Sequence, residues 1–129
     1  MKSKEFKSVE EALEIFEKSA VLYSNALTKG NSRTANKNFD ICINCVLYLH
    51  EHGQIKKLHP LLKHEDPGVR LKSACILLPF YRQESENVLS EIANGNYYPL
   101  TSFNAEMTLV QWKKGNLISP WEWDSQKIC

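Results

Sequence analysis

The sequence contains no apolar run of the roughly 20 residues that a membrane-spanning helix requires, and its first six residues, MKSKEF, lack the apolar core of a signal peptide. It also lacks a charge excess, because 16 Lys and Arg oppose 15 Asp and Glu and leave a formal net charge of +1. Proteins that hold nucleic acid by neutralising phosphates are usually far more basic. We therefore expect a cytoplasmic protein without a membrane partner, and the charge balance does not favour direct nucleic-acid binding.

The common catalytic and cofactor motifs are missing as well. There is no GxxxxGK[ST] or GxGxxG to cradle a phosphate, no GxSxG nucleophile turn, and no HExxH zinc motif among the four histidines. Cys42 and Cys45 form a CxxC pair, but they fall inside an expected helix, away from the N-terminal end that lowers a thiol pKa. A zinc site would need two more ligands. We expect core thiols, no catalytic residue, no metal and no cofactor.

The sequence does contain helical periodicity and helix-capping signals. With 129 residues, of which 43% are hydrophobic, it is long enough for one domain with its own core, spanning residues 1–129. Ser8, Asn31 or Ser32, and Asp66 can cap helices, and apolar residues recur at three- and four-residue steps. Six helical segments are predicted, at about 9–29, 32–52, 55–62, 67–78, 88–94 and 103–114. No alternating segment suggests a strand, so the predicted class is all-α.

Four pairs of apolar residues recur at a spacing of 31, which suggests a repeated helix pair. They are Leu58 and Leu89, Leu61 and Ile92, Ala74 and Ala105, and Leu78 and Leu109. A repeated helix pair is typical of a helical solenoid. The alanines would then lie where two helices approach closely, and the leucines would fill the layer between pairs.

Two segments resemble known sequences. Residues 64–74, HEDPGVRLKSA, resemble the opening of the inner helix of HEAT-like repeats, and residues 104–117, NAEMTLVQWKKGNL, resemble the closing segment of a family of small bacterial proteins with a HEAT-like domain of unknown function. The likeness covers about residues 55–118. It implies a HEAT-like α-α superhelix of about three helix pairs, whose concave side is lined by the second, fourth and sixth helices.

The same resemblance implies a function. Members of the family are encoded beside polymorphic toxins, including those of contact-dependent growth inhibition, and such neighbours are typically immunity proteins. The chain is then expected to bind a cognate toxin, a nuclease domain of a large exported protein, and to neutralise it by occluding its active site. The family motif carries no catalytic residue onto this sequence, and we expect no enzymatic activity and no small-molecule ligand.

Candidate partner-binding residues fall into three groups. Carboxylates could mimic the phosphates of a nuclease substrate. Basic side chains lie near a possible concave face, although the simpler interpretation is that they are solvated and balance the charges of Glu65 and Asp66. In the Trp-rich tail, residues 118–129, Pro120 predicts an extended chain with both tryptophans on one side, docked either on the last helix or on a partner. The candidates are Asp40, Glu84, Glu86, Glu106, Glu122 and Asp124, then Arg70 and Lys72, then Trp121 and Trp123.

Two other functions stay open. One is a nucleic-acid-binding or repair-related HEAT-like protein that uses Arg70, Lys72, Lys113 and Lys114. The other is a general protein-interaction adaptor. A steep salt dependence of nucleic-acid binding would favour the first of these.

Overall fold

The computed structural model describes residues 6–123, and these residues form helices and turns without any strand. The predicted all-α class is confirmed for this part of the chain. The elements are α1 (Val9–Thr28), α2 (Ser32–Glu51), the 3-10 helix η1 (Ile55–Lys63), α3 (Pro67–Leu77), α4 (Arg82–Asn94), α5 (Pro99–Lys113) and the 3-10 turn η2 (Pro120–Glu122).

The predicted caps begin three of the helices. The Ser8 hydroxyl accepts the backbone N–H of Glu11 at 3.1 Å, and the Asn31 side chain accepts that of Thr34 at 3.1 Å. Asp66 accepts the N–H of Gly68 at 2.7 Å at the start of α3. Each cap satisfies a backbone donor that has no partner inside its helix.

Two features differ from the predicted helices. The segment at 55–63 is a 3-10 helix, and it contains Pro60, whose ring and missing N–H disfavour a continuous α-helix. Helices α4 and α5 begin at Arg82 and Pro99, several residues before their predicted starts. Their first turns are largely polar or exposed, so apolar periodicity does not mark them.

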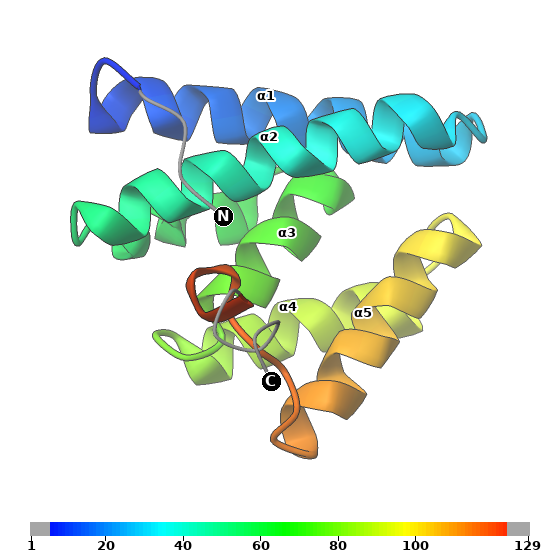
Figure 1. Cartoon of the computed structure of the whole chain (residues 1–129). Helices are drawn as coiled ribbons and strands as arrows, with labels where there is room; N and C mark the ends of the chain where they lie inside the picture. Colours follow the sequence, from blue (N-terminus) through cyan, green and yellow to red (C-terminus); the bar gives the residue numbers. More distant parts are fainter. Residues whose placement is uncertain (1–5, 124–129) are drawn as a thin grey trace.

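The helices pack as successive pairs (Figure 1). α1 and α2 lie antiparallel along one side of the molecule, α4 and α5 form the opposite side, and α3 lies between the two pairs. After α5 the chain turns back, so that η2, drawn in red, packs against α2. The fold therefore leaves the inner sides of α2, α3 and α5 facing a common space.

One continuous core joins the pairs. Its fully buried large side chains include Phe16, Leu49, Leu58, Leu77, Leu78, Leu89 and Ile92. Small residues occupy the close contacts: Ala74 and Ala105 have no exposed surface, and a Cβ added at Gly68 would overlap the side chain of Ser24. Burial of this apolar surface is the main force that holds the helices together.

Candidate functional site

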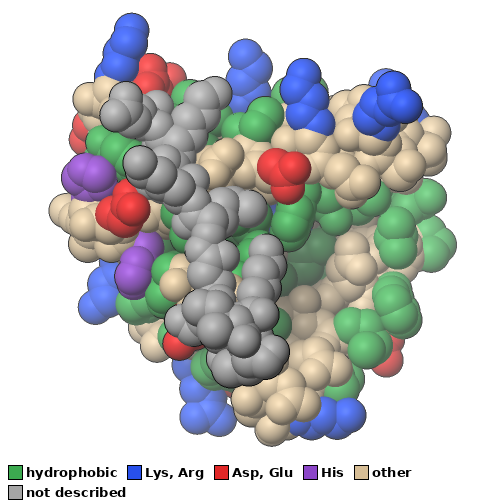
Figure 2. Space-filling model, in the orientation of Figure 1, with side chains coloured by type: hydrophobic (Ala, Val, Ile, Leu, Met, Phe, Trp, Pro, Cys, Tyr) green, Lys and Arg blue, Asp and Glu red, His purple; other side chains and the backbone are tan. Residues whose placement is uncertain are grey.

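A pocket of about 390 Å³ opens between the α1–α2 pair, α3 and α5. Figure 2 shows this hollow with hydrophobic side chains around it. Its lining comes mainly from α2, α3 and α5, which are the second, fourth and sixth helical segments, and α1 and the chain after α5 complete it. Pockets of this size are within the range of about 300–1,000 Å³ that small-molecule sites occupy.

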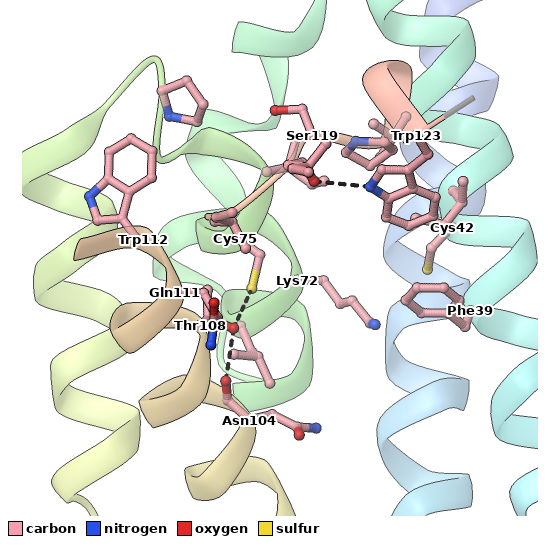
Figure 3. Close-up of a pocket in the computed structure, with 18 of the residues that line it drawn as sticks. Phe39, Cys42, Lys72, Cys75, Asn104, Thr108, Gln111, Trp112, Ser119 and Trp123 are labelled. Carbon is pink, nitrogen blue, oxygen red and sulfur yellow. Dashed lines mark hydrogen bonds between the residues drawn. The ribbon is translucent and has the colours of Figure 1, made fainter. Parts of the chain in front are cut away.

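Lys72 is the only charged side chain among the described residues that line the pocket. It extends from α3 across the pocket toward Phe39 (Figure 3). Its Nζ lies 3.8 Å from the ring centroid of Tyr23 and 4.2 Å from that of Phe39, so two aromatic rings contact the ammonium group. Such cation–π contacts are strongest where water is excluded.

The surroundings of Lys72 disfavour its charge. Burial lowers the pKa of its ammonium group, and the nearby thiols of Cys42 and Cys75 oppose that shift. No ion pair joins Lys72 to a carboxylate within residues 6–123. The interpretation of Lys72 as a solvated basic residue that balances Glu65 and Asp66 is therefore wrong, because the helix directs this side chain inward.

The thiols of Cys42 and Cys75 lie near Lys72, and their surroundings disfavour the thiolate form. Cys42 and Cys45 are buried in α2, and the Cys42 thiol donates to the carbonyl oxygen of Phe16 at 3.8 Å. Burial raises the pKa of Cys42 to about 11, and burial also raises the pKa of Cys75. A thiol that stays protonated near neutral pH is a poor nucleophile. Within residues 6–123 no cluster of three or more His, Cys, Asp or Glu side chains could hold a metal ion.

Polar groups of α5 form one wall of the pocket. The Cys75 thiol donates to the Thr108 hydroxyl at 3.5 Å, and that hydroxyl donates to the backbone oxygen of Asn104 at 2.8 Å (Figure 3). The side-chain amides of Asn104 and Gln111 also line the pocket and form no hydrogen bond with another described residue. These two amides can therefore accept or donate hydrogen bonds to an occupant.

The two predicted tail tryptophans dock on the body of the protein. Trp121 stacks on His50, with ring centroids 4.2 Å apart, and Trp123 stacks on Phe39 at 6.3 Å. The predicted extended chain is wrong for Pro120–Glu122, because Ser119 and Glu122 form a capping box around the 3-10 turn η2; residues 124–129 of the tail lie outside the described residues. Docking on the last helix is wrong as well, since both rings stack on side chains of α2. Trp123 also lines the pocket.

Arg70 is held by its own neighbourhood. Its guanidinium donates to the backbone oxygens of His64 at 2.7 Å and Glu65 at 3.1 Å, and to the Tyr97 hydroxyl at 2.9 Å. It also lies 3.6 Å from the Glu91 carboxylate. These contacts tie α3 to the chain before α5, so most of the hydrogen-bonding capacity of Arg70 is used inside the protein.

The predicted carboxylates do not gather at one place. Glu84 pairs with His59 at 2.8 Å, and Glu86 accepts the indole N–H of Trp112 at 2.7 Å. That hydrogen bond, with a second from Arg82, lowers the pKa of Glu86. Asp40, Glu106 and Glu122 are exposed, and none of the three forms an ion pair with the described residues, although Glu122 accepts the backbone N–H of Ser119. Asp124 lies outside the described residues.

Sequence reasoning missed the aromatic partners of Lys72. Tyr23 lies in α1 and Phe39 in α2, where the apolar residues recur at the three- and four-residue steps that predict these helices. Their positions in the helices could have indicated them. Both rings lie on helix faces that also carry core residues, and Lys72 directly follows the buried Leu71. The pairing itself depends on how α3 crosses α1 and α2, which periodicity does not specify.

No protein-family model, curated protein or solved structure matches this chain. No helix in residues 6–123 has the length and apolar character needed to span a bilayer.

Lys72→Met should raise the free energy of unfolding by about 1–2 kcal/mol near pH 7, because it removes a largely buried, unpaired charge and keeps the apolar stem. A lysine whose folded pKa is lowered binds fewer protons in the folded state than in the unfolded state, so its contribution to stability rises with pH. The gain of the variant should shrink as pH rises through the lowered folded pKa toward the unfolded value of 10.5. Urea unfolding at several pH values measures both effects.

Lys56→Met is the matched control, because Lys56 is exposed on η1. We expect it to change the free energy of unfolding by less than about 0.5 kcal/mol at every pH. A Lys72→Met variant that is less stable than the wild type at pH 7 would show that the aromatic contacts outweigh desolvation.

Proposed function

We propose that the chain is an immunity protein that binds a cognate bacterial toxin in the cytoplasm and neutralises it by occlusion, without turnover. The proposed toxin class is a nuclease domain of a large exported protein. The resemblance of residues 64–74 and 104–117 to the small bacterial HEAT-like family suggests this class, and the surface of α5 supports a protein partner.

The observation that carries the proposal is an exposed apolar stripe on α5. Leu100, Phe103 and Met107 follow one another at helical spacing, and the Phe103 side chain is 54% exposed. Tyr98, just before the helix, is exposed as well. Large exposed apolar side chains that adjoin one another mark interaction surfaces more often than isolated ones do. Met107 also lines the pocket, so the stripe continues into the concave side of the molecule.

Two carboxylates qualify as phosphate mimics next to an apolar contact. Glu106 lies on α5 beside Met107, and Asp40 lies on α2 beside Phe39, whose ring lines the pocket. Both are exposed and without ion pairs to the described residues. Carboxylates with no internal counter-ion are available to a basic substrate-binding cleft of a nuclease.

We also propose that the helix pairs are HEAT-like repeats stacked into a short superhelix. The pairs would be α1–α2, η1–α3 and α4–α5, and each packs mainly on its neighbours. Burial of both Ala74 and Ala105 supports the 31-residue spacing, because small residues are required at equivalent close contacts.

A nucleic-acid-binding function has less support. Two of its four basic residues are engaged inside the protein, Arg70 by backbone oxygens and Tyr97, and Lys72 by two aromatic rings. Lys113 and Lys114 are exposed at the end of α5. Two lysines supply few phosphate contacts, so tight binding through this surface is not expected.

The proposal places a toxin domain in a neighbouring gene, and that domain provides the test. We expect purified protein to block its activity at a 1:1 ratio, and Phe103→Glu with Met107→Glu to weaken the complex by about 2 kcal/mol or more, which is roughly thirty-fold in Kd. Charge reversal of Asp40 with Glu106 should also weaken it. Titration calorimetry and survival of toxin-expressing cells measure both effects.

Charge reversal of Glu10 with Glu14 is the control, because both lie exposed on α1 and away from the stripe. It should leave protection unchanged. Neutralisation at far below equimolar amounts would contradict occlusion and indicate an enzymatic activity. Full protection by the Phe103→Glu, Met107→Glu variant would show that the partner binds elsewhere.

A further inference from the structure

Among the described residues that line the pocket, Lys72 is the single cation and no other side chain is charged. The Lys72 ammonium group lies against the rings of Tyr23 and Phe39, and no carboxylate of residues 6–123 pairs with it. The ammonium group has three N–H donors, and aromatic faces replace only part of the hydration that it loses on burial. An anion that enters the pocket would supply the missing counter-ion where water screens the attraction poorly.

The rest of the pocket is built for an apolar body. Its walls include Ile43, Val46, Ile76, Met107 and Ile118, and about 390 Å³ of space lies between them. Burial of an alkyl chain or ring system against these side chains is favourable at about 25 cal/mol per Å² of apolar surface removed from water. A ligand that pairs with Lys72 and also packs against these apolar side chains is therefore amphiphilic.

The hydrogen-bond donors that line the pocket favour some classes of anion over others. Phosphate and sulfate esters are usually held by several donors, such as arginine forks or helix N-terminal amides. Here the described lining holds one lysine and no arginine, with the side-chain amides of Asn104 and Gln111 as additional polar groups. One cation and a few neutral donors suit a singly charged headgroup of small size.

We infer that this pocket binds a monocarboxylate with an apolar chain or ring system, whose carboxylate pairs with Lys72 and whose body lies between α2 and α5. This assignment departs from the expectation that the protein takes no small-molecule ligand. It does not depend on the proposed toxin partner, because the assignment rests on Lys72 and the pocket lining, of which only Met107 also belongs to the exposed stripe.

Three matched ligands test the headgroup on the wild-type chain: decanoate and decylammonium, each below its micelle concentration, and decan-1-ol, below its solubility limit. Titration by calorimetry, with amide chemical shifts to locate the contact, should show decanoate binding at least ten-fold tighter than the alcohol, because a charge-assisted contact is added to the same apolar body. Decylammonium should bind more weakly than the alcohol. Equal binding of acid and alcohol, or shifts confined to residues outside the pocket, would overturn the assignment.

Lys72 variants test the cation. Lys72→Met should lose at least ten-fold in affinity for decanoate and keep the affinity for decan-1-ol, while Lys72→Arg should retain most of the decanoate affinity. Lys56→Met, on the exposed face of η1, should match the wild type. The wild-type comparison of the three ligands decides the question even if a variant folds poorly, and unchanged decanoate binding by a folded Lys72→Met variant would contradict the inference.

Discussion

Phe16→Ala is expected to lower the free energy of unfolding by about 3–5 kcal/mol, the usual cost of truncating a buried phenylalanine. Phe16 is 1% exposed and lies in α1 at the contact with α2, and its backbone oxygen accepts the Cys42 thiol. Phe16 also lines the pocket, so on that side the neighbouring side chains cannot move in to fill the space that the smaller alanine leaves. Chemical denaturation monitored by circular dichroism measures the loss.

Phe103→Ala is the control, because it also removes a phenyl ring but leaves no cavity inside the protein. Phe103 is 54% exposed on α5, so we expect a change of less than about 0.5 kcal/mol. The same variant keeps the fold for binding experiments. A loss below about 1 kcal/mol for Phe16→Ala would show that α1 does not pack against α2 as described.

The helices were predictable because their signals are local. Ser8, Asn31 and Asp66 each satisfy backbone donors within three residues, and apolar residues at three- and four-residue steps identify the buried faces without knowledge of the partner helix. The helix starts without such signals were misplaced. Arg82 and Pro99 begin helices for which no side chain caps the N-terminus, and their first turns carry few apolar residues.

The tail contains a local capping signal that could have predicted its turn from the sequence. Ser119 followed three residues later by Glu122 has the same spacing as Ser8 and Glu11, and in both places the spacing forms a capping box or cap at a helical start. Proline at the first position of a helical turn is also favourable. Proline also starts extended segments, which is why the sequence predicts an extended chain at Pro120, and a turn of three residues is too short to show helical periodicity.

The pocket could not be predicted, because it depends on contacts between residues far apart in the sequence. Tyr23, Phe39 and Lys72 come from three helices, and nothing in their own segments indicates that the two rings meet one ammonium group. Composition even argues for a solvated Lys72, since lysine is rarely buried. Asp40 and Glu106 are predicted from charge and expected exposure, and the structure adds that neither has a counter-ion in the described residues.

Ala74→Trp and Ala105→Trp should each destabilise the protein by about 3 kcal/mol or more, at or beyond the upper end of the usual cost of overpacking a core. Both alanines have no exposed surface, in α3 and in α5, and lie 31 residues apart in equivalent positions of the proposed repeats. An indole there must push the helices apart, since neither alanine borders the pocket, which could otherwise take up the volume.

Glu106→Trp, at the exposed position next to Ala105, adds the same group and should cost less than about 0.5 kcal/mol. Thermal and urea unfolding of the three variants, compared at equal protein concentration, measure the difference. Tolerance of tryptophan at both alanines would mean that neither position is a close helix contact and that the 31-residue alignment does not describe a structural repeat.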